Sequence, residues 1–139
     1  MISSDFTLRV IYADTDMMGR VYYGRFFEYF EAARSSMLRE LGLPYTEIER
    51  IGIFLPVIES HCIYLSGATF EDILTIRTTI RDLPRAKIRI DYEVIKQGRE
   101  LLIAEGYTVH SFVNSNGKAV KPPKVFLETL KSHWKQSHE

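Results

Sequence analysis

The sequence is poor in cysteine, has no excess of either charge and contains no long apolar run, and each of these absences excludes a class of protein. Cys62 has no second cysteine for an internal disulfide, so a reducing cytoplasm is expected. The eighteen basic and eighteen acidic residues cancel, which argues against nucleic acid as the main partner. No stretch reaches the roughly 18 apolar residues of a membrane span, and the N-terminal MISSDFTLR lacks the basic and apolar regions of a signal peptide.

The four histidines show no metal-ligand pattern. They are His61, His110, His133 and His138. Their spacing to one another and to the cysteine does not match a zinc site, so no metal is expected. His61 and Cys62 are neighbours in an extended stretch, where adjacent side chains point to opposite faces, so they are poorly placed as base and nucleophile. A buried thiol is the better interpretation of Cys62.

One long amphipathic helix is indicated directly after Gly24. Its apolar residues recur at three- and four-residue steps, the period of a helix buried along one side. They are Phe26, Phe30, Ala33, Met37 and Leu41. Gly42 and Pro44 end the helix, as a C-terminal glycine followed by proline usually does. A sheet is expected to cover the apolar stripe.

Extended segments and short helices are expected around this helix. The extended segments are residues 6–13, 53–65, 74–81, 87–94 and 100–113, and the short helices are residues 46–51 and 125–134. Residues 74–81 and 87–94 alternate apolar with polar or charged side chains, which indicates a sheet with one face exposed to solvent. In the last strand, one side is expected to carry Leu101, Ile103, Tyr107 and Val109.

The order of these elements predicts an α+β fold. A strand comes first, then one long helix, then four strands joined by short turns, and short connections force antiparallel neighbours. The alternating strand and helix units of a doubly wound parallel sheet are absent. With 139 residues, of which 45% are hydrophobic, the chain is expected to form one domain over residues 1–139. In it, a curved antiparallel sheet of about five strands wraps a long central helix.

A specific motif runs through the start of the helix. The run YADTDMMGRVYYGRFFEYFEAARSSMLRELG joins an aspartate, a glycine three residues later, a Val-Tyr-aromatic step and a Phe-Glu-x-Ala-Arg helix. It resembles the signature of the hotdog-fold acyl-CoA thioesterases related to 4-hydroxybenzoyl-CoA thioesterase, including those associated with the bacterial Tol-Pal system. Weaker matches continue at residues 54–57 and 104–110 and at Gly117-Lys118, so the resemblance covers nearly the whole chain.

The resemblance implies roles for residues of this motif. Asp16 matches the aspartate that acts as a general base on water or as a nucleophile, and the sequence leaves both roles open. Backbone N–H groups near Tyr23 and Gly24, at the positive end of the helix, would stabilise the oxyanion. Gly19 would allow a close turn, and Gly24 would let the thioester approach the backbone. Tyr22 would line the acyl pocket or pack at the start of the helix.

One position departs from part of the family. Tol-Pal-associated relatives often have histidine where this chain has Tyr23, and a neutral tyrosine cannot supply imidazole chemistry near pH 7. The Asp16 step and the backbone oxyanion site do not depend on that histidine. Asp14, which also precedes the helix, is interpreted as a structural cap or turn residue.

Four cations at turns or just beyond a strand are candidates for binding the phosphates of coenzyme A. They are Arg85, Lys87, Lys118 and Lys121. Solvated surface charge is at least as good an interpretation of each. Coenzyme A is part of the substrate here, and no cofactor is expected. The resemblance further implies a homodimer or homotetramer with the active site at the subunit interface, and a long exposed strand edge would favour such pairing.

The sequence therefore predicts an acyl-CoA thioester hydrolase that releases a carboxylic acid and free coenzyme A, with Asp16 as the essential side chain. The alternative is a non-catalytic acyl-CoA-binding hotdog module, because a fold alone does not fix function. An apolar strand followed by Asp-x-Asp is also found in phosphatases of the haloacid dehalogenase type, but their alternating strand and helix units are missing here. The acyl chain preference, whether short, aromatic or long, stays open.

Overall fold

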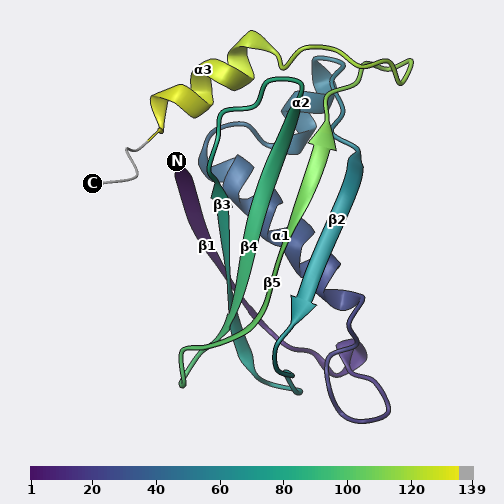
Figure 1. Ribbon diagram of the computed structural model, residues 1–139, viewed down its shortest axis with the longest axis vertical. Helices are drawn as coiled ribbons and strands as arrows, with labels where there is room; N and C mark the ends of the chain where they lie inside the picture. Colours follow the sequence, from purple (N-terminus) through teal and green to yellow (C-terminus); the bar gives the residue numbers. More distant parts are fainter. Residues whose placement is uncertain (135–139) are drawn as a thin grey trace.

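A computed structural model describes residues 1–134 and shows a five-stranded sheet with three helices on one face and at one end (Figure 1). The strands are β1 (Ile2–Arg9), β2 (Val57–Tyr64), β3 (Ile73–Ile80), β4 (Lys87–Lys96) and β5 (Leu101–Ser111). The helices are α1 (Arg25–Glu40), α2 (Tyr45–Arg50) and α3 (Lys124–Ser132), and a 3-10 turn, η1, covers Tyr12–Asp14. No helix in the described part of the chain is long and apolar enough to cross a membrane.

The sheet has the order β1-β3-β4-β5-β2, and every neighbouring pair is antiparallel. This confirms the predicted curved antiparallel sheet of about five strands. β1 and β2 are the two edge strands, and α1 packs across the inner face of the sheet, in contact with β1 and β3 (Figure 1).

The buried face of α1 is the one that its apolar spacing predicts. Phe26, Phe30, Ala33 and Met37 are all buried. The ring of Phe30 stacks on Tyr92 of β4, with centroids 4.2 Å apart and planes 5° apart. Gly106 of β5 lies beside this stack, where a Cβ atom would be 2.1 Å from the His61 carbonyl oxygen and 3.1 Å from the Phe30 ring. Only glycine lets β2, β5 and α1 approach so closely here.

Two strand predictions need correction. β1 begins at Ile2 and ends at Arg9, earlier than the predicted residues 6–13, because its first residues pair with β3 in the register Ile2↔Ile80. In β5, the predicted common face of Ile103 and Tyr107 is wrong. A register shift against β4 places an extra residue at Ile103, which reverses the alternation that follows. Ile103 is therefore buried, whereas Tyr107 turns to the outer face.

The reversed alternation turns polar residues of β5 inward. His110 and Thr108 are buried, and they form a hydrogen-bonded chain with Tyr92. Because a carbonyl only accepts, His110 Nδ1–H donates to the Leu55 oxygen at 3.0 Å, and Nε2 accepts from the Thr108 hydroxyl at 2.9 Å. The Tyr92 hydroxyl then donates to Thr108 at 2.7 Å. Burial lowers the pKa of His110, so the ring is neutral near pH 7.

Candidate active site

Residues 14–22, which connect η1 to the start of α1, fold into a short antiparallel ribbon, here called the Asp16 ribbon. The Tyr22 N–H donates to the Asp14 carbonyl at 2.9 Å, Thr15 and Val21 form an isolated bridge, and the Asp16 N–H donates to the Arg20 carbonyl at 2.7 Å. The sequence forms this ribbon because residue 19 is a glycine. Gly19 has a φ of +79°, a conformation that other residues rarely adopt, and its N–H donates to the Asp16 carbonyl at 3.0 Å. The ribbon therefore has a tight turn at the predicted position.

The Asp16 carboxylate is held by its own ribbon and is exposed. Its Oδ1 accepts hydrogen bonds from the N–H groups of Met18, at 2.9 Å, and Arg20, at 3.2 Å. Within residues 1–134, no donor contacts Oδ2. One oxygen thus fixes the orientation of the carboxylate, and the other is available to a water molecule or a substrate.

The start of α1 presents two backbone donors. The N–H groups of Arg25 and Phe26 donate to carbonyls of the preceding turn, but those of Tyr23 and Gly24 find no acceptor among the described residues. Both donors lie at the positive end of a sixteen-residue helix. Such a pair is suited to bind a negatively charged oxygen, as an oxyanion site requires.

Tyrosine rings surround these donors. Tyr22 and Tyr23 are 47% and 61% exposed, and their ring centroids lie 4.5 Å apart. The Tyr22 ring covers Gly24 so closely that a Cβ atom there would be 2.9 Å from it. The neighbouring Tyr23 hydroxyl raises the pKa of Tyr22, so this phenol is neutral near pH 7. The Tyr64 hydroxyl, from β2, donates to the Tyr23 carbonyl at 3.2 Å.

Two residues of this site carry no signal of their own in the sequence. Tyr29 lies in the apolar stripe of α1, where an aromatic residue indicates only core, yet its hydroxyl donates to Asp14 Oδ2 at 2.8 Å. Tyr64 lies at the end of an edge strand, and only the folded chain brings it to the start of α1. Asp14 does not cap the helix, because no side chain caps α1 at Gly24.

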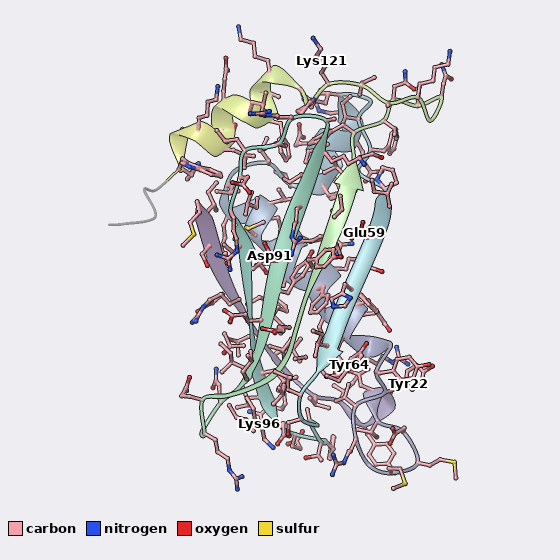
Figure 2. The ribbon with its side chains drawn as sticks, viewed as in Figure 1. Tyr22, Glu59, Tyr64, Asp91, Lys96 and Lys121 are labelled. Carbon is pink, nitrogen blue, oxygen red and sulfur yellow. The ribbon has the colours of Figure 1, made fainter. Side chains whose placement is uncertain are left out.

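The four cations predicted for coenzyme A lie away from Asp16. Arg85 and Lys87, before and at the start of β4, line a hollow of about 780 Å³, and Lys121 lines an adjoining hollow together with Arg85. Lys118 is in a separate turn, where its N–H donates to Asn114. Figure 2 shows Lys121 and Tyr22 at opposite ends of the molecule. Arg85, Lys87 and Lys121 therefore lie close together within one chain, but far from Asp16 of the same chain.

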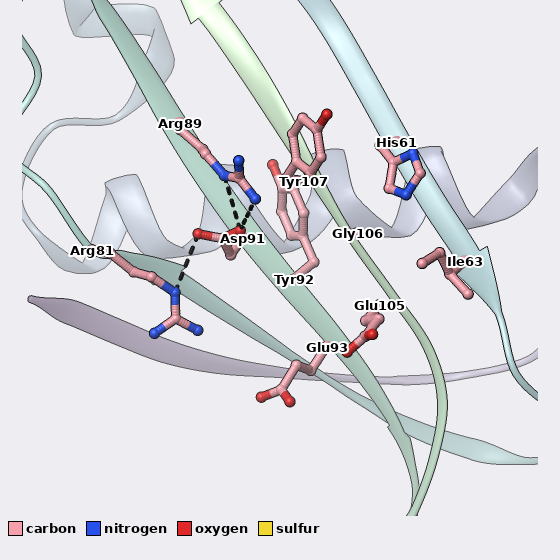
Figure 3. A pocket seen from close by; sticks show the side chains of 10 residues that line it. All are labelled: His61, Ile63, Arg81, Arg89, Asp91, Tyr92, Glu93, Glu105, Gly106 and Tyr107. Atoms are coloured by element: carbon pink, nitrogen blue, oxygen red, sulfur yellow. Dashed lines mark hydrogen bonds and ion pairs between the residues drawn. The ribbon is translucent and has the colours of Figure 1, made fainter.

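The outer face of the sheet carries a third hollow, of about 380 Å³ (Figure 3). The carboxylate of Asp91 pairs with Arg81 at 3.4 Å and with Arg89 at 3.1 Å. The Arg89 guanidinium lies 3.9 Å from the centre of the Tyr107 ring, and His61 stacks on the same ring. The sheet separates these charged groups from α1 (Figure 3).

The predicted separation of His61 and Cys62 is confirmed. His61 is on the outer face with Tyr107, whereas Cys62 is half-buried on the inner face, and burial raises the pKa of its thiol. Among residues 1–134, no group of three or more histidine, cysteine or acidic side chains is placed to hold a metal ion. His138 lies outside the described residues.

Comparison with known proteins gives a consistent picture. Residues 10–130 match the family model of the thioesterase-like superfamily. A protein of Aquifex aeolicus is 32% identical over 123 residues, which are 88% of this chain and 94% of that protein. The acyl-CoA thioesterase YbgC of Helicobacter pylori is 30% identical over 125 residues, 88% of this chain and 79% of the relative. The structure of the DHNA-CoA thioesterase of Staphylococcus aureus, at 25% identity, superposes with a TM-score of 0.87 over 96% of this chain and 89% of that one.

Proposed function

Since the chain belongs to the thioesterase-like superfamily, we propose that it hydrolyses acyl-CoA thioesters to a carboxylic acid and free coenzyme A. The observation that carries this proposal is the pairing of two features at one end of the molecule. Asp16 offers a carboxylate oxygen without a protein partner in the described chain, and Tyr23 and Gly24 offer free N–H donors at a helix start. Thioester hydrolysis needs both a group that activates or replaces water and a donor pair for the oxyanion.

The proposed reaction assigns each group a step. Asp16 takes the proton of a water molecule that attacks the thioester carbon, or attacks that carbon itself to form an anhydride that water then opens. The N–H groups of Tyr23 and Gly24 bind the oxygen that becomes negative. When the carbon–sulfur bond breaks, the coenzyme A thiolate leaves and takes up a proton. Tyr22 remains uncharged, and the rings of Tyr22 and Tyr23 line the acyl side of the site. These steps use no metal and no cofactor.

We infer that the fold around this site is the hotdog arrangement, with α1 as its central helix and residues 1–139 as one domain. The sixteen residues of α1 support this inference, because they cross the inner face of the sheet with their apolar side buried against it (Figure 1). The Asp16 ribbon then lies at one end of that helix.

We also propose that two copies pair through β2. This edge strand has no partner on its outer side in a single chain, and large apolar side chains along and beyond it are exposed. They are Val57, Ile58, Ile63, Tyr64 and Leu65, each between 42% and 54% exposed. Antiparallel pairing of two β2 strands about a two-fold axis brings the basic end of one copy towards the Asp16 ribbon of the other. Arg85, Lys87, Lys118 and Lys121 of the second copy would then meet the phosphates of coenzyme A.

Thiol release from a panel of short, medium, long and aromatic acyl-CoAs tests the function. We expect at least one substrate to release coenzyme A, detected with a thiol-reactive dye, and the preferred one to name the acyl class. If acyl-CoA binds by calorimetry but no thiol appears, the chain is a binding module and the proposal is wrong. We place the enzyme in the cytoplasm, since Cys62 has no disulfide partner in the chain.

The assembly has its own test. Light scattering after gel filtration should give the mass of a dimer or a larger even assembly at micromolar concentration. The monomer mass at every concentration would contradict the β2 pairing, and the thiol assay would show whether a monomer still turns over.

A further inference from the structure

We propose that Asp14 and Tyr29 form a positioning pair that locks the Asp16 ribbon against α1 and so sets the geometry of the reacting groups. This inference rests on the proposed thioesterase function. It assigns a role in that reaction to two residues that would not themselves touch the substrate.

The contact between the two residues is short and shielded. The Tyr29 hydroxyl donates to Asp14 Oδ2 at 2.8 Å, and Tyr29 is only 6% exposed. The Asp14 side chain is 14% exposed, and its Oδ1 lies 3.7 Å from Arg25 Nε. Glu28 holds the same guanidinium, with both carboxylate oxygens near 3 Å from Arg25 Nη1. A carboxylate with these neighbours has little freedom to swing away from the helix.

Because Asp14 is part of the ribbon, its hydrogen bond to Tyr29 also constrains the position of Asp16. The Asp14 carbonyl accepts the Tyr22 N–H at 2.9 Å, so Asp14 and Tyr22 close the base of the ribbon. Asp16 lies two residues after Asp14 on one strand of the ribbon, and Tyr23, with its N–H donor, directly follows Tyr22 on the other. Because the Asp14 side chain ties the base to α1 through Tyr29, any tilt of the ribbon would move Asp16 relative to the two backbone donors.

The geometry also excludes the simpler role of a helix cap. A capping aspartate accepts backbone N–H groups of the first turn, whereas α1 has no side-chain cap and Asp14 accepts a phenol from the second turn. Burial, followed by the Asp14 carboxylate, raises the pKa of Tyr29, so the phenol stays a donor across the working range of the enzyme. The contact therefore fixes an orientation, and the Tyr29 phenol keeps its proton during the reaction.

The test removes the hydroxyl alone. Tyr29→Phe should lower kcat about tenfold or more and change KM less than about twofold, because a small displacement of reacting groups costs rate and not binding. Asp14→Ala should do the same. Asp14→Asn should keep most of the rate, since its amide oxygen still accepts from Tyr29. The double variant Asp14→Ala with Tyr29→Phe should be no slower than either single variant.

Tyr45→Phe is the matched control. Tyr45 is a half-buried tyrosine of α2 whose hydroxyl donates to the Leu55 carbonyl at 3.1 Å, away from the ribbon. We expect it to lower the melting temperature about as much as Tyr29→Phe does while kcat stays unchanged. Hydrogen exchange gives a second readout, in which the Asp16 and Tyr22 amides should exchange faster in Tyr29→Phe than in Tyr45→Phe.

The outcomes separate the inference from the function on which it rests. If the wild type turns over and Tyr29→Phe keeps its kcat, the positioning role is wrong and the thioesterase function stands. If both tyrosine variants lose rate in proportion to their loss of stability, the effect is general and the inference is overturned. A wild type that hydrolyses no thioester overturns the proposed function itself. If the Asp16 and Tyr22 amides then also exchange no faster in Tyr29→Phe than in Tyr45→Phe, the positioning role of Asp14 and Tyr29 is overturned as well.

Discussion

Gly106→Ala tests the close approach of β2 and α1 to β5. A Cβ atom at position 106 would lie 2.1 Å from the His61 carbonyl oxygen and 3.1 Å from both the Cys62 Cα and the Phe30 ring. Two of these neighbours are backbone atoms of β2, which is paired with β5 at this point in the register Cys62↔Gly106. The strands must therefore separate by about 1 Å before the contact reaches 3.0 Å, the shortest that real Cβ atoms make.

The magnitude follows from the stiffness of those neighbours. Overpacking a core site costs about 1–3 kcal/mol, and a backbone clash in a paired strand places this substitution near the upper end. A loss of about 3 kcal/mol lowers the melting temperature of a domain of this size by roughly 10 °C and the urea midpoint by about 1–2 M at an unchanged slope.

The assay is urea unfolding at one fixed protein concentration, with Gly67→Ala as the control. The three atoms nearest to a Cβ atom at Gly67 all belong to the flexible Arg20 side chain, which can move aside. The free energy of unfolding of Gly67→Ala should therefore stay within about 0.5 kcal/mol of that of the wild type. If Gly106→Ala unfolds at the same urea concentration as the wild type, the close approach of β2 to β5 at Gly106 is wrong.

Two further predictions concern buried polar groups. Thr78 Oγ1 is buried and has no hydrogen-bond partner among residues 1–134, so Thr78→Val should raise the free energy of unfolding by about 1 kcal/mol, and a loss in urea unfolding would contradict this. His110 has a lowered pKa because it is buried. The unfolded state therefore takes up a proton below pH 6.5 that the folded state does not, so the free energy of unfolding should decrease as the pH is lowered, by up to about 1.4 kcal/mol per pH unit. His110→Gln should remove this part of the slope between pH 7.5 and 5.5, and an unchanged slope would refute the assignment.

The sequence predicts the elements that follow one clear period. The stripe from Phe26 to Met37 has the helical period because the sheet covers one side of α1, and β4 alternates because only one of its faces is buried. β5 could not be predicted in the same way. Its extra residue at Ile103 reverses the alternation, and a bulge has no signature in composition. The polar start of β1 has low strand propensity, and pairing with β3 overrides it.

The site was predictable in part, for similar reasons. The turn at Gly19 and the donors at the start of α1 follow from local chemistry, so the sequence predicts where they lie. The bond between Tyr29 and Asp14 joins a residue of the apolar stripe to a residue interpreted as a turn former, and only their proximity in the fold gives it meaning. The cations near β4 and α3 share one end of the molecule, a grouping that their separation in the chain concealed.

The most direct test of the account is the rate of thiol release by Asp16→Asn on the preferred acyl-CoA. Asp5→Asn is the matched control, because Asp5 is an exposed carboxylate that pairs with Arg77 on the outer face of the sheet. We expect Asp16→Asn to lose about 10²–10⁴ in kcat with its fold kept, while Asp5→Asn keeps the rate of the wild type. If Asp16→Asn is as active as the wild type, Asp16 does not carry the chemistry and the proposed mechanism is wrong.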